Sequence, residues 1–355
     1  MPMGLHPICG HQDLLSRLEG AIASGRFPQA ALLVGPPGVG KQRIALWVAQ
    51  ALLCDEAGGA PCESCQGCRL AVGLSHPDLH WFVPIPRPKS SDPTRQVEEA
   101  AELLGEAMAE RRDGITRPPD GMLGHPIASI RRLHRVAGLT PFKAKRKVLI
   151  VGDAERLVLQ ESSPEAANAL LKVLEEPPRD TTLILTAADL QALLPTIRSR
   201  VVPIRVRRVS DDAVREFLTS FPTPPVTGRA LARRVDHAQG CIGAALWLDD
   251  EGATAADAAA GRVLAATRGG AATWSTLALG QAPWAARGAF TDTLEAMALS
   301  LRRDIETLAG RNDTVAVARR LAALRRVEET RAEAAGNLNP QLALAALAHD
   351  LEALA

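Results

Sequence analysis

The sequence predicts an α/β fold, a doubly wound parallel sheet, followed by an all-helical C-terminal region. A glycine-rich loop, GPPGVGKQ at 35–42, lies between a short apolar run and a helical pattern. Apolar runs typical of buried strands then alternate with helical patterns, and beyond residue 208 the strand pattern disappears. Strands that alternate with helices after a glycine-rich loop are typical of a parallel sheet with helices on both faces.

The first elements surround the glycine-rich loop. Apolar residues at helical spacing predict a helix over 11–24, and the run AALLV predicts a strand at 30–34. A helix over 41–53 follows the loop, and DLHWFV predicts a second strand at 78–83. Strand, loop and helix in this order are the context that a phosphate-binding loop requires, because backbone N–H groups at a helix N-terminus attract anions.

Four of the six cysteines gather in the stretch CDEAGGAPCESCQGC, at Cys54, Cys62, Cys65 and Cys68. Two overlapping C-x-x-C steps and one upstream cysteine suit a tetrahedral structural zinc site, with no open position for catalytic water. Disulfide or redox chemistry and plain reduced thiols are the alternatives, and disulfides are rare in a reducing cytoplasm. Cys9 and Cys241 are isolated, and we expect small buried hydrophobes at both positions.

The later elements complete the expected sheet. Residues 84–126 change to a Pro-rich, polar character with one amphipathic helix, and we interpret them as a partly mobile surface insertion. Further strands and helices follow, and the C-terminal part is helical. Helices are expected at 129–139 and 162–178, strands at 147–152, 182–187 and 201–206, a small helical unit at 208–252 and a longer helical region at 253–355.

The glycine-rich loop departs from the phosphate-loop motif at its last residue. Gln42 stands where a Ser or Thr hydroxyl would ligate Mg²⁺. At the end of the strand VLIVGD, Gly152 and Asp153 stand where an ATPase carries Asp-Glu, so the Mg²⁺ carboxylate is missing too. Three alternatives remain open for this loop: it binds nucleotide without hydrolysis, it no longer binds nucleotide, or it hydrolyses ATP. The nucleotide-binding candidates are Gly35, Pro36, Gly38, Val39, Gly40, Lys41 and Gln42.

Composition and charge narrow the class of protein. The formal net charge is +1, so no global nucleic-acid or membrane footprint is present. The start of the chain does not resemble a signal peptide, and no run of about 18 apolar residues exists, so we expect a cytoplasmic protein. The local run KAKRK at 143–147 is basic. We expect this run to form a solvated face, or else to contact DNA phosphates or an acidic neighbouring subunit. No aromatic residue is interleaved within the run that could stack on bases.

Several motifs together resemble bacterial AAA+ clamp-loader subunits. These are the four-cysteine cluster after the phosphate-loop helix, ANALLKVLEEPP within 166–178, PTIRSRV at 195–201 and NLNPQLALAALAHDL at 337–351. The similarity covers most of the chain apart from 84–126. Within this family the gamma/tau motor subunits keep an intact ATP site, whereas delta-prime subunits of DNA polymerase III commonly do not, and this sequence is similar to the delta-prime type.

The resemblance implies roles for particular residues. Ser199 and Arg200 match the start of the family's Ser-Arg-Cys motif, whose arginine is a trans finger that reaches a neighbour's ATP, and Arg198 is a second candidate contact. From the residues alone, a solvated or ion-paired arginine at the start of a strand is the favoured interpretation of Arg200. Gly243 stands where motor subunits carry a nucleotide-sensing arginine. The resemblance also implies that the four clustered cysteines bind zinc.

The resemblance further implies a domain organisation and partners. It predicts an AAA+ domain at 1–207 with a zinc module at 54–68, a helical lid at 208–252 and a helical collar at 253–355. Such a subunit belongs to a hetero-oligomeric ring with gamma/tau and delta, and helps to load the sliding clamp on primer-template DNA for the polymerase III core. Weak ATP or ADP binding without productive Mg²⁺ is expected. The alternatives are a gamma/tau-like ATPase motor and a zinc-dependent DNA-binding module.

Overall fold

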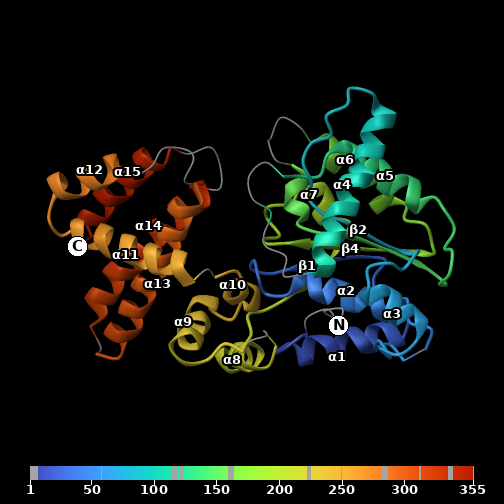
Figure 1. Cartoon of the computed structure of the whole chain (residues 1–355), viewed down its shortest axis with the longest axis horizontal. Helices are drawn as coiled ribbons and strands as arrows, with labels where there is room; N and C mark the ends of the chain where they lie inside the picture. The colour runs from blue at the N-terminus through green and yellow to red at the C-terminus, as the bar shows by residue number, and fades with distance from the viewer. Residues whose placement is uncertain are drawn as a thin grey trace. The chain divides into compact units, whose positions relative to one another are not determined.

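The computed structural model describes residues 7–56, 58–113, 119, 123–158, 164–221, 225–248, 250–280, 287–311, 313–334 and 339–354. The chain divides into two compact units, Met1–Trp247 and Leu248–Ala355. The first unit holds a sheet with helices on both sides, and in the described residues the second unit is helical throughout (Figure 1).

The sheet of the first unit has five parallel strands in the order β2-β3-β4-β1-β5. Register pairs such as Leu32 with Leu185 and Ile150 with Ile184 align the apolar residues of neighbouring strands. The predicted α/β fold with a parallel sheet is therefore confirmed. The strands are β1 (Ala30–Val34), β2 (Leu79–Phe82), β3 (Lys147–Val151), β4 (Thr181–Ala187) and β5 (Val202–Arg205).

Helices cover both faces of this sheet, with α1, α2 and α3 on one side and α4, α5, α6 and α7 on the other (Figure 1). Every residue of β3 and β4 is buried, as expected for strands covered on both faces. All helices predicted in this part of the sequence are present. Their bounds are α1 (Gln12–Ala23), α2 (Lys41–Leu52), α3 (Gln66–Val72), α4 (Pro93–Asp113), α5 (Ile127–Ala137), η1 (Ala154–Leu157), α6 (Glu165–Glu175) and α7 (Pro195–Arg198).

The segment 84–126 is anchored more firmly than a surface insertion requires. Ile85 and Gly124 form an antiparallel bridge that joins its two ends. Its helix α4 packs on α5 and buries Val97, Ala100 and Leu104 in the core of the sheet unit. These three residues lie three and four positions apart, so one face of α4 is apolar. Residues 114–118 and 120–122 of this segment lie outside the described residues, as do 159–163 before α6.

Three short helices end the first unit and have an apolar cluster of their own. They are α8 (Asp211–Ser220), α9 (Gly228–Ala238) and α10 (Ile242–Trp247). Val214, Phe217 and Leu218 of α8 pack with Val235 of α9 and Ala245 of α10. The Ser210 side chain caps α8 by accepting a hydrogen bond from Ala213 N. The predicted division of the chain into three domains stays a prediction.

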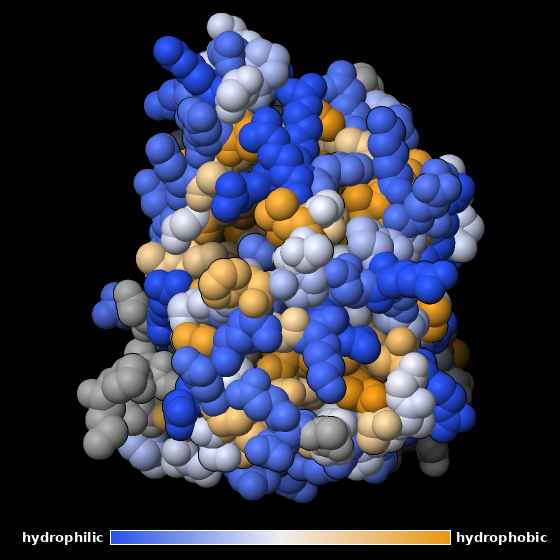
Figure 2. Space-filling model, turned by 90° about the vertical axis from the view of Figure 1, so that its right-hand side faces the viewer, coloured by the Kyte–Doolittle hydropathy of each residue, from blue (hydrophilic) through white to orange (hydrophobic). Residues whose placement is uncertain are grey.

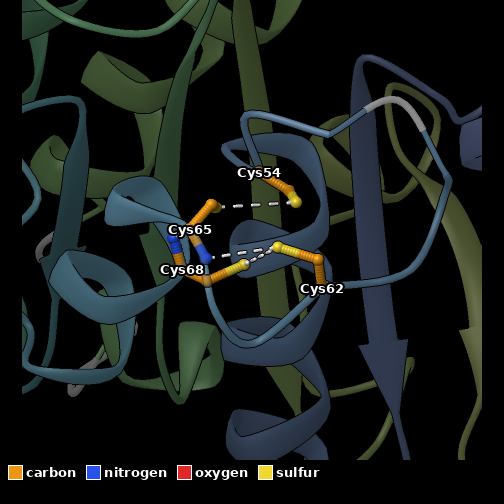
Figure 3. Close-up of side chains that lie close together, drawn as sticks. All are labelled: Cys54, Cys62, Cys65 and Cys68. Atoms are coloured by element: carbon orange, nitrogen blue, oxygen red, sulfur yellow. Dashed lines mark hydrogen bonds between the residues drawn. The ribbon is translucent and has the colours of Figure 1, made fainter.

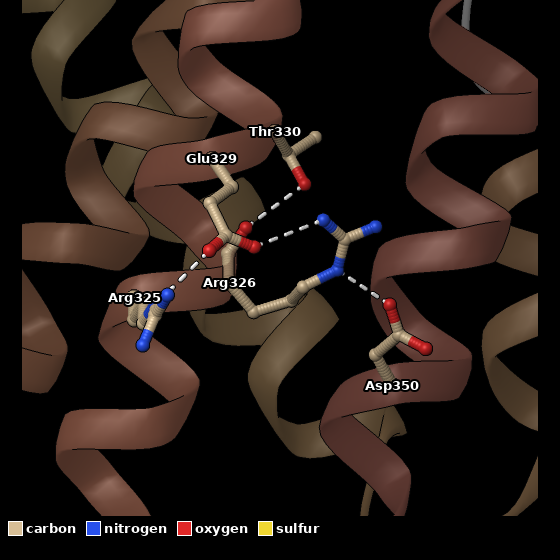
Figure 4. Close-up of polar contacts among 5 residues, drawn as sticks. All are labelled: Arg325, Arg326, Glu329, Thr330 and Asp350. Atoms are coloured by element: carbon tan, nitrogen blue, oxygen red, sulfur yellow. Dashed lines mark hydrogen bonds and ion pairs between the residues drawn. The ribbon is translucent and has the colours of Figure 1, made fainter.

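The second unit is a helical bundle around a separate apolar core that includes Leu294, Met297 and Val327. Arg326 Nε of α14 donates to Asp350 Oδ2 of α15 at 2.5 Å, which links these two helices (Figure 4). None of the described helices combines the length and the hydrophobicity needed to cross a bilayer. The helices are α11 (Asp250–Ala266), α12 (Ala271–Leu279), α13 (Arg287–Ala309), α14 (Thr314–Ala334) and α15 (Pro340–Glu352).

Candidate functional site

The glycine-rich loop connects the carboxyl end of β1 to the start of α2, as predicted. Gly40 precedes α2 in the left-handed region, with φ at 101°, and its carbonyl accepts the first helical hydrogen bond, from Ile44 N. A Cβ on Gly35 would lie 2.2 Å from Val206 O, so only glycine fits there. The sequence therefore produces the backbone of a phosphate-binding loop at the edge of the sheet where parallel-sheet proteins bind ligands.

The side chain of the loop lysine, Lys41, forms hydrogen bonds with the backbone of its own loop. Lys41 is buried, and its Nζ donates to Gly35 O at 2.7 Å and to Pro36 O at 2.9 Å. Burial lowers the pKa of Lys41, while the nearby carboxyls of Glu155 and Asp153 oppose this shift. The ammonium that would bind a nucleotide phosphate thus satisfies the carbonyls of its own loop.

Gln42 binds the one carboxylate that remains from the expected acidic pair. Its Nε2 donates to Asp153 Oδ2 at 2.8 Å. Asp153 has left-handed backbone angles, φ 50° and ψ 56°, and its N–H donates to Thr186 Oγ1 at 3.0 Å. Burial raises the pKa of Asp153, against the attraction of Lys41. The neutral amide of Gln42 therefore lies between the loop and the Asp153 carboxylate, and an amide is a poor ligand for Mg²⁺.

Gly152 leaves room for this amide. A Cβ at position 152 would lie 3.2 Å from Trp81 Nε1 and 3.3 Å from Gln42 Nε2, which is tighter than ordinary side-chain contacts. A carboxylate at 152 would extend further toward the same atoms. The two departures from an ATPase, at 42 and at 152, therefore lie close together, and a side chain at 152 would require Gln42 or Trp81 to shift by a few tenths of an ångström.

Two residues that the sequence did not indicate complete this site. The Arg111 guanidinium of α4 lies over the Trp81 ring, 5.2 Å from its centroid. Burial lowers the pKa of Arg111, and the carboxylate of Asp153 opposes the shift. Within the described structure, four buried polar atoms here have no hydrogen-bond partner, an arrangement that suits ordered water. They are Gln42 Oε1, Trp81 Nε1, Arg111 Nε and Glu155 Oε2.

Helix α10 lies directly on the glycine-rich loop. Gly243 N donates to Gly38 O at 2.8 Å, and a Cβ on Gly243 would lie 2.7 Å from the Gly38 Cα. A Cβ on Gly38 would in turn lie 3.1 Å from the Trp247 ring and 2.7 Å from Ala244 N. No side chain fits at 243 in this arrangement, and a nucleotide-sensing arginine there would separate α10 from the loop.

Arg200 lies between α7 and β5 and is ion-paired within its own chain. Its Nη2 is 2.7 Å from Glu175 Oε1 at the end of α6, and its Nη1 donates to Thr196 O at 2.9 Å. The Arg200 side chain is 33% exposed, so a partner molecule can reach it. Arg198 contacts Gln191 Oε1 instead. The pairing of Arg200 with Glu175 is a contact that the sequence pattern alone did not indicate.

The four clustered cysteines converge as predicted (Figure 3). Cys54 follows α2, Cys62 lies in the connecting loop, and Cys65 and Cys68 belong to the first turn of α3. The Sγ atoms of Cys54 and Cys65 are 3.8 Å apart, and those of Cys62 and Cys68 are 3.9 Å apart. A tetrahedral zinc with Zn–S bonds of about 2.3 Å places its sulfur atoms about 3.8 Å apart. The cluster can therefore hold a tetrahedral metal ion.

Backbone N–H groups already point at these sulfur atoms. Cys65 N donates to Cys62 Sγ at 3.3 Å, and Cys68 N donates to Cys65 Sγ at 3.3 Å. The hydrogen bond from Cys65 N, with help from Ser64, lowers the pKa of Cys62 to about 6, which favours the thiolate that binds metals. All six cysteines are free thiols in the structure, and Cys241 is buried.

The comparisons with known proteins match this chain to subunits of DNA polymerase III, with delta' and gamma subunits among the relatives. Residues 10–210 match the family described as "DNA polymerase III, delta subunit". The chain is 28% identical over 224 residues to DNA polymerase III subunit delta' of Bacillus subtilis (strain 168), covering 63% of this chain and 56% of that protein. It is 32% identical over 192 residues to DNA polymerase III subunit delta' of Pseudomonas aeruginosa, covering 54% and 46%.

The sequence alignments cover only part of this chain, whereas a structural alignment covers nearly all of it. The chain spans about half the length of the two curated relatives. A solved structure titled as a DNA polymerase III gamma subunit-related protein from Thermotoga maritima is 18% identical, with a TM-score of 0.38, and the alignment covers 96% of this chain and 99% of that one.

Proposed function

Because the chain belongs to the DNA polymerase III delta subunit family, we propose that it acts as a delta-prime subunit of a clamp loader. In this role it is a largely non-hydrolysing AAA+ subunit that helps to place a sliding clamp on primed DNA during replication. Its partners are gamma/tau and delta subunits in a hetero-oligomeric ring, the clamp, primer-template DNA and the polymerase III core.

One observation carries the proposal that the chain does not hydrolyse ATP: the hydrogen bond between Gln42 Nε2 and Asp153 Oδ2. A hydrolysing site needs Mg²⁺ between a loop hydroxyl and a strand carboxylate, and an acidic residue to orient water. Here Gln42 replaces the residue with the hydroxyl, and Gly152 replaces the residue with the carboxylate. Asp153 accepts a hydrogen bond from the Gln42 amide. ATP or ADP is held weakly at most, without productive Mg²⁺.

The chain contributes to catalysis through Arg200. In the assembled ring this guanidinium leaves Glu175 and reaches the γ-phosphate bound to a neighbouring motor subunit. There it stabilises the charge that develops during phosphoryl transfer, an effect of about 10³- to 10⁵-fold in comparable NTPases. The partial exposure of Arg200 and its single carboxylate partner at 2.7 Å support this role.

The cysteine cluster supports a structural zinc site. Four thiolates leave no open coordination position, so the metal's contribution is stability: it ties the end of α2 to the start of α3. Gly67 permits this closure, because a Cβ there would lie 2.3 Å from Leu53 O. We assign no catalytic step to the metal. The three-domain division, with an AAA+ part, a lid at 208–252 and a collar at 253–355, and a cytoplasmic location belong to the same proposal.

Removal of zinc is expected to destabilise the sheet unit. The purified chain should contain one zinc per molecule, and a strong chelator should lower its melting temperature by several degrees, since metal binding is folding free energy. Cys65→Ser should release the metal and give the same shift. Cys9→Ser, outside the cluster, is the matched control and should retain the full metal content. A chain that melts at the same temperature with and without metal would contradict a structural role.

The experiment that tests the proposed function is steady-state ATP hydrolysis by the purified chain with Mg²⁺ and primed DNA. We expect no turnover above the rate of the buffer, because the site lacks both Mg²⁺ ligands. The rate of the reconstituted loader, measured in parallel with and without this chain, shows whether it acts through partners. Robust turnover by the chain alone would instead identify a gamma/tau-like motor.

The same preparation tests the remaining alternative, a zinc-dependent DNA-binding module. Such a module would bind duplex DNA by itself with a steep salt dependence. The net charge of +1 argues against this behaviour. Tight, zinc-dependent binding of duplex DNA by the isolated chain, together with no effect on loader ATPase, would replace the clamp-loader proposal.

A further inference from the structure

A basic loop at residues 138–146 connects α5 to β3 (Figure 1). It carries two exposed apolar side chains. Phe142 is 86% exposed and Leu139 is 65% exposed. Figure 2 shows that hydrophobic side chains reach this side of the molecule only as small patches between hydrophilic ones. Water-exposed aromatic rings cost free energy unless a ligand covers them, so this loop is a candidate for a binding surface.

A buried carboxylate holds the loop in place. Asp78, which is 2% exposed and precedes β2, accepts hydrogen bonds from three consecutive backbone N–H groups. They are Phe142 N at 2.6 Å, Lys143 N at 2.8 Å and Ala144 N at 2.7 Å. Burial alone would raise the pKa of Asp78, but these three N–H groups outweigh it and lower the pKa below its ordinary value. The hydrogen bond to buried Asp78 thus fixes the backbone position of Phe142.

A buried lysine holds the other end of the loop. Lys147 is 2% exposed, and its Nζ donates to Val136 O and Ala137 O at 2.8 Å each, and to Leu139 O. The ammonium therefore satisfies the carbonyls at the C-terminus of α5, where a helix favours positive charge. Two buried charged groups that bond to backbone atoms make a preorganised loop, and a preorganised loop loses little entropy on binding.

The exposed charges of the loop are all positive. Lys143, Lys145 and Arg146 are exposed, whereas Lys147, the last residue of the basic run, is buried. Lys143 Nζ donates to Gln66 Oε1 at 2.9 Å, a neutral partner beside the cysteine cluster. Three cations next to an exposed ring are the combination with which proteins bind single strands: the cations follow the phosphates and the ring stacks on a base.

We propose that this basic loop binds single-stranded DNA, with Phe142 stacked on a base and Lys143, Lys145 and Arg146 facing the phosphates. The aromatic ring favours a single strand, because the bases of a duplex are stacked on one another and present no free face. Phe142 directly precedes the basic run at 143–147, within which no aromatic residue is interleaved. The loop precedes β3 and therefore lies at the opposite end of the sheet from the glycine-rich loop, so DNA and nucleotide would not compete.

The proposal rests on the proposed function, because it gives the primer-template partner of a clamp loader a second contact on the unpaired strand. The first experiment measures the binding of a labelled oligothymidine to the full chain by fluorescence anisotropy at low salt. Phe142→Ala should weaken binding about tenfold, the effect of one base stacking on one ring. Phe142→Trp should retain the affinity.

Substitutions of the cations test the phosphate contacts. Changing Lys143, Lys145 and Arg146 together to Gln should reduce the slope of log affinity against log salt by about two, since each single-strand phosphate contact contributes about 0.7. The control triple variant removes the same charge at Arg87, Lys89 and Arg95, which are exposed on the segment 84–126. It should leave the slope unchanged. Equal effects of the two triple variants would overturn the proposal.

A photoreactive benzoyl-phenylalanine at position 142 identifies the ligand in the reconstituted loader with primed DNA. An adduct with the unpaired template strand supports the proposal, and an adduct with a protein subunit alone overturns it. ATP hydrolysis by the same loader is measured in parallel, with and without this chain. The two readouts separate the two hypotheses. No crosslink to DNA in a loader of normal activity rejects only the proposed DNA binding by the basic loop. A loader that hydrolyses ATP equally well without this chain rejects the proposed function.

Discussion

Replacement of Gly152 by Asp is expected to lower the free energy of unfolding by roughly 3 kcal/mol, the cost of a crowded and unpaired buried carboxylate. The new Cβ alone would lie 3.2 Å from Trp81 Nε1 and 3.3 Å from Gln42 Nε2. The new carboxylate would also stand beside Asp153, whose pKa burial already raises. For a unit of this size, we expect the melting temperature to fall by about 6–12 °C.

Two further variants distinguish the steric cost of a side chain at position 152 from the cost of its charge. Gly152→Ala adds only the Cβ and should cost about 1 kcal/mol or less. In the background Gln42→Thr, which shortens the opposing side chain, Gly152→Asp should cost at least about 1 kcal/mol less than in the parent chain. The measurement is thermal unfolding of the four chains of this double-mutant cycle. Additive effects would show that positions 42 and 152 do not compete for one space.

The same cycle tests the chemical consequence. Gln42→Thr alone restores a hydroxyl but no carboxylate, so it should not produce ATP hydrolysis. Appreciable turnover by this single variant would refute the assignment of Gly152 to the missing metal ligand.

Arg200→Ala is expected to reduce ATP hydrolysis at the neighbouring site by about 10³-fold, while the chain itself folds normally. The partly exposed pair with Glu175 contributes at most about 1 kcal/mol to stability, so its loss leaves the chain folded. The measurement is single-turnover hydrolysis by the reconstituted loader, in which the site next to this chain appears as a lost fast phase.

Two variants nearby serve as controls for the finger. Arg198→Ala removes a cation two positions away, and we expect hydrolysis within a few-fold of the parent. Glu175→Gln keeps Arg200 but removes the carboxylate 2.7 Å from its Nη2. If the finger acts in trans, this variant should hydrolyse ATP at least as fast as the parent. Hydrolysis that is unchanged in Arg200→Ala would exclude the finger role.

Local patterns predicted most of the sheet unit. The strands at Ala30–Val34, Lys147–Val151 and Thr181–Ala187 are short apolar runs, and their burial in a parallel sheet follows from that composition. The cysteine cluster was predictable because its four ligands lie within a stretch of 15 residues, so the spacing alone brings them together. The predicted family is confirmed by the family model that matches residues 10–210.

Contacts between distant residues were not predictable in this way. Arg111 and Trp81 are 30 positions apart, and their stacking depends on how α4 packs across the sheet. The same holds for Asp78 and the N–H groups of residues 142–144, and for Glu175 and Arg200. The amphipathic helix predicted within 84–126 is present as α4, but the interpretation of this segment as a surface insertion was wrong, because Val97, Ala100 and Leu104 of α4 are buried in the core.

The two carbonyl contacts of Lys41 have a consequence for how the chain responds to its surroundings. A ligand that binds only the folded state stabilises it by RT ln(1 + [L]/Kd), so the stabilisation changes with the ligand concentration. The Lys41 ammonium has intramolecular acceptors at 2.7 and 2.9 Å, whose effective concentration does not vary with the supply of ATP. If the chain acts as proposed, its glycine-rich loop keeps its shape when the ATP concentration falls, and the response to ATP comes from neighbouring subunits.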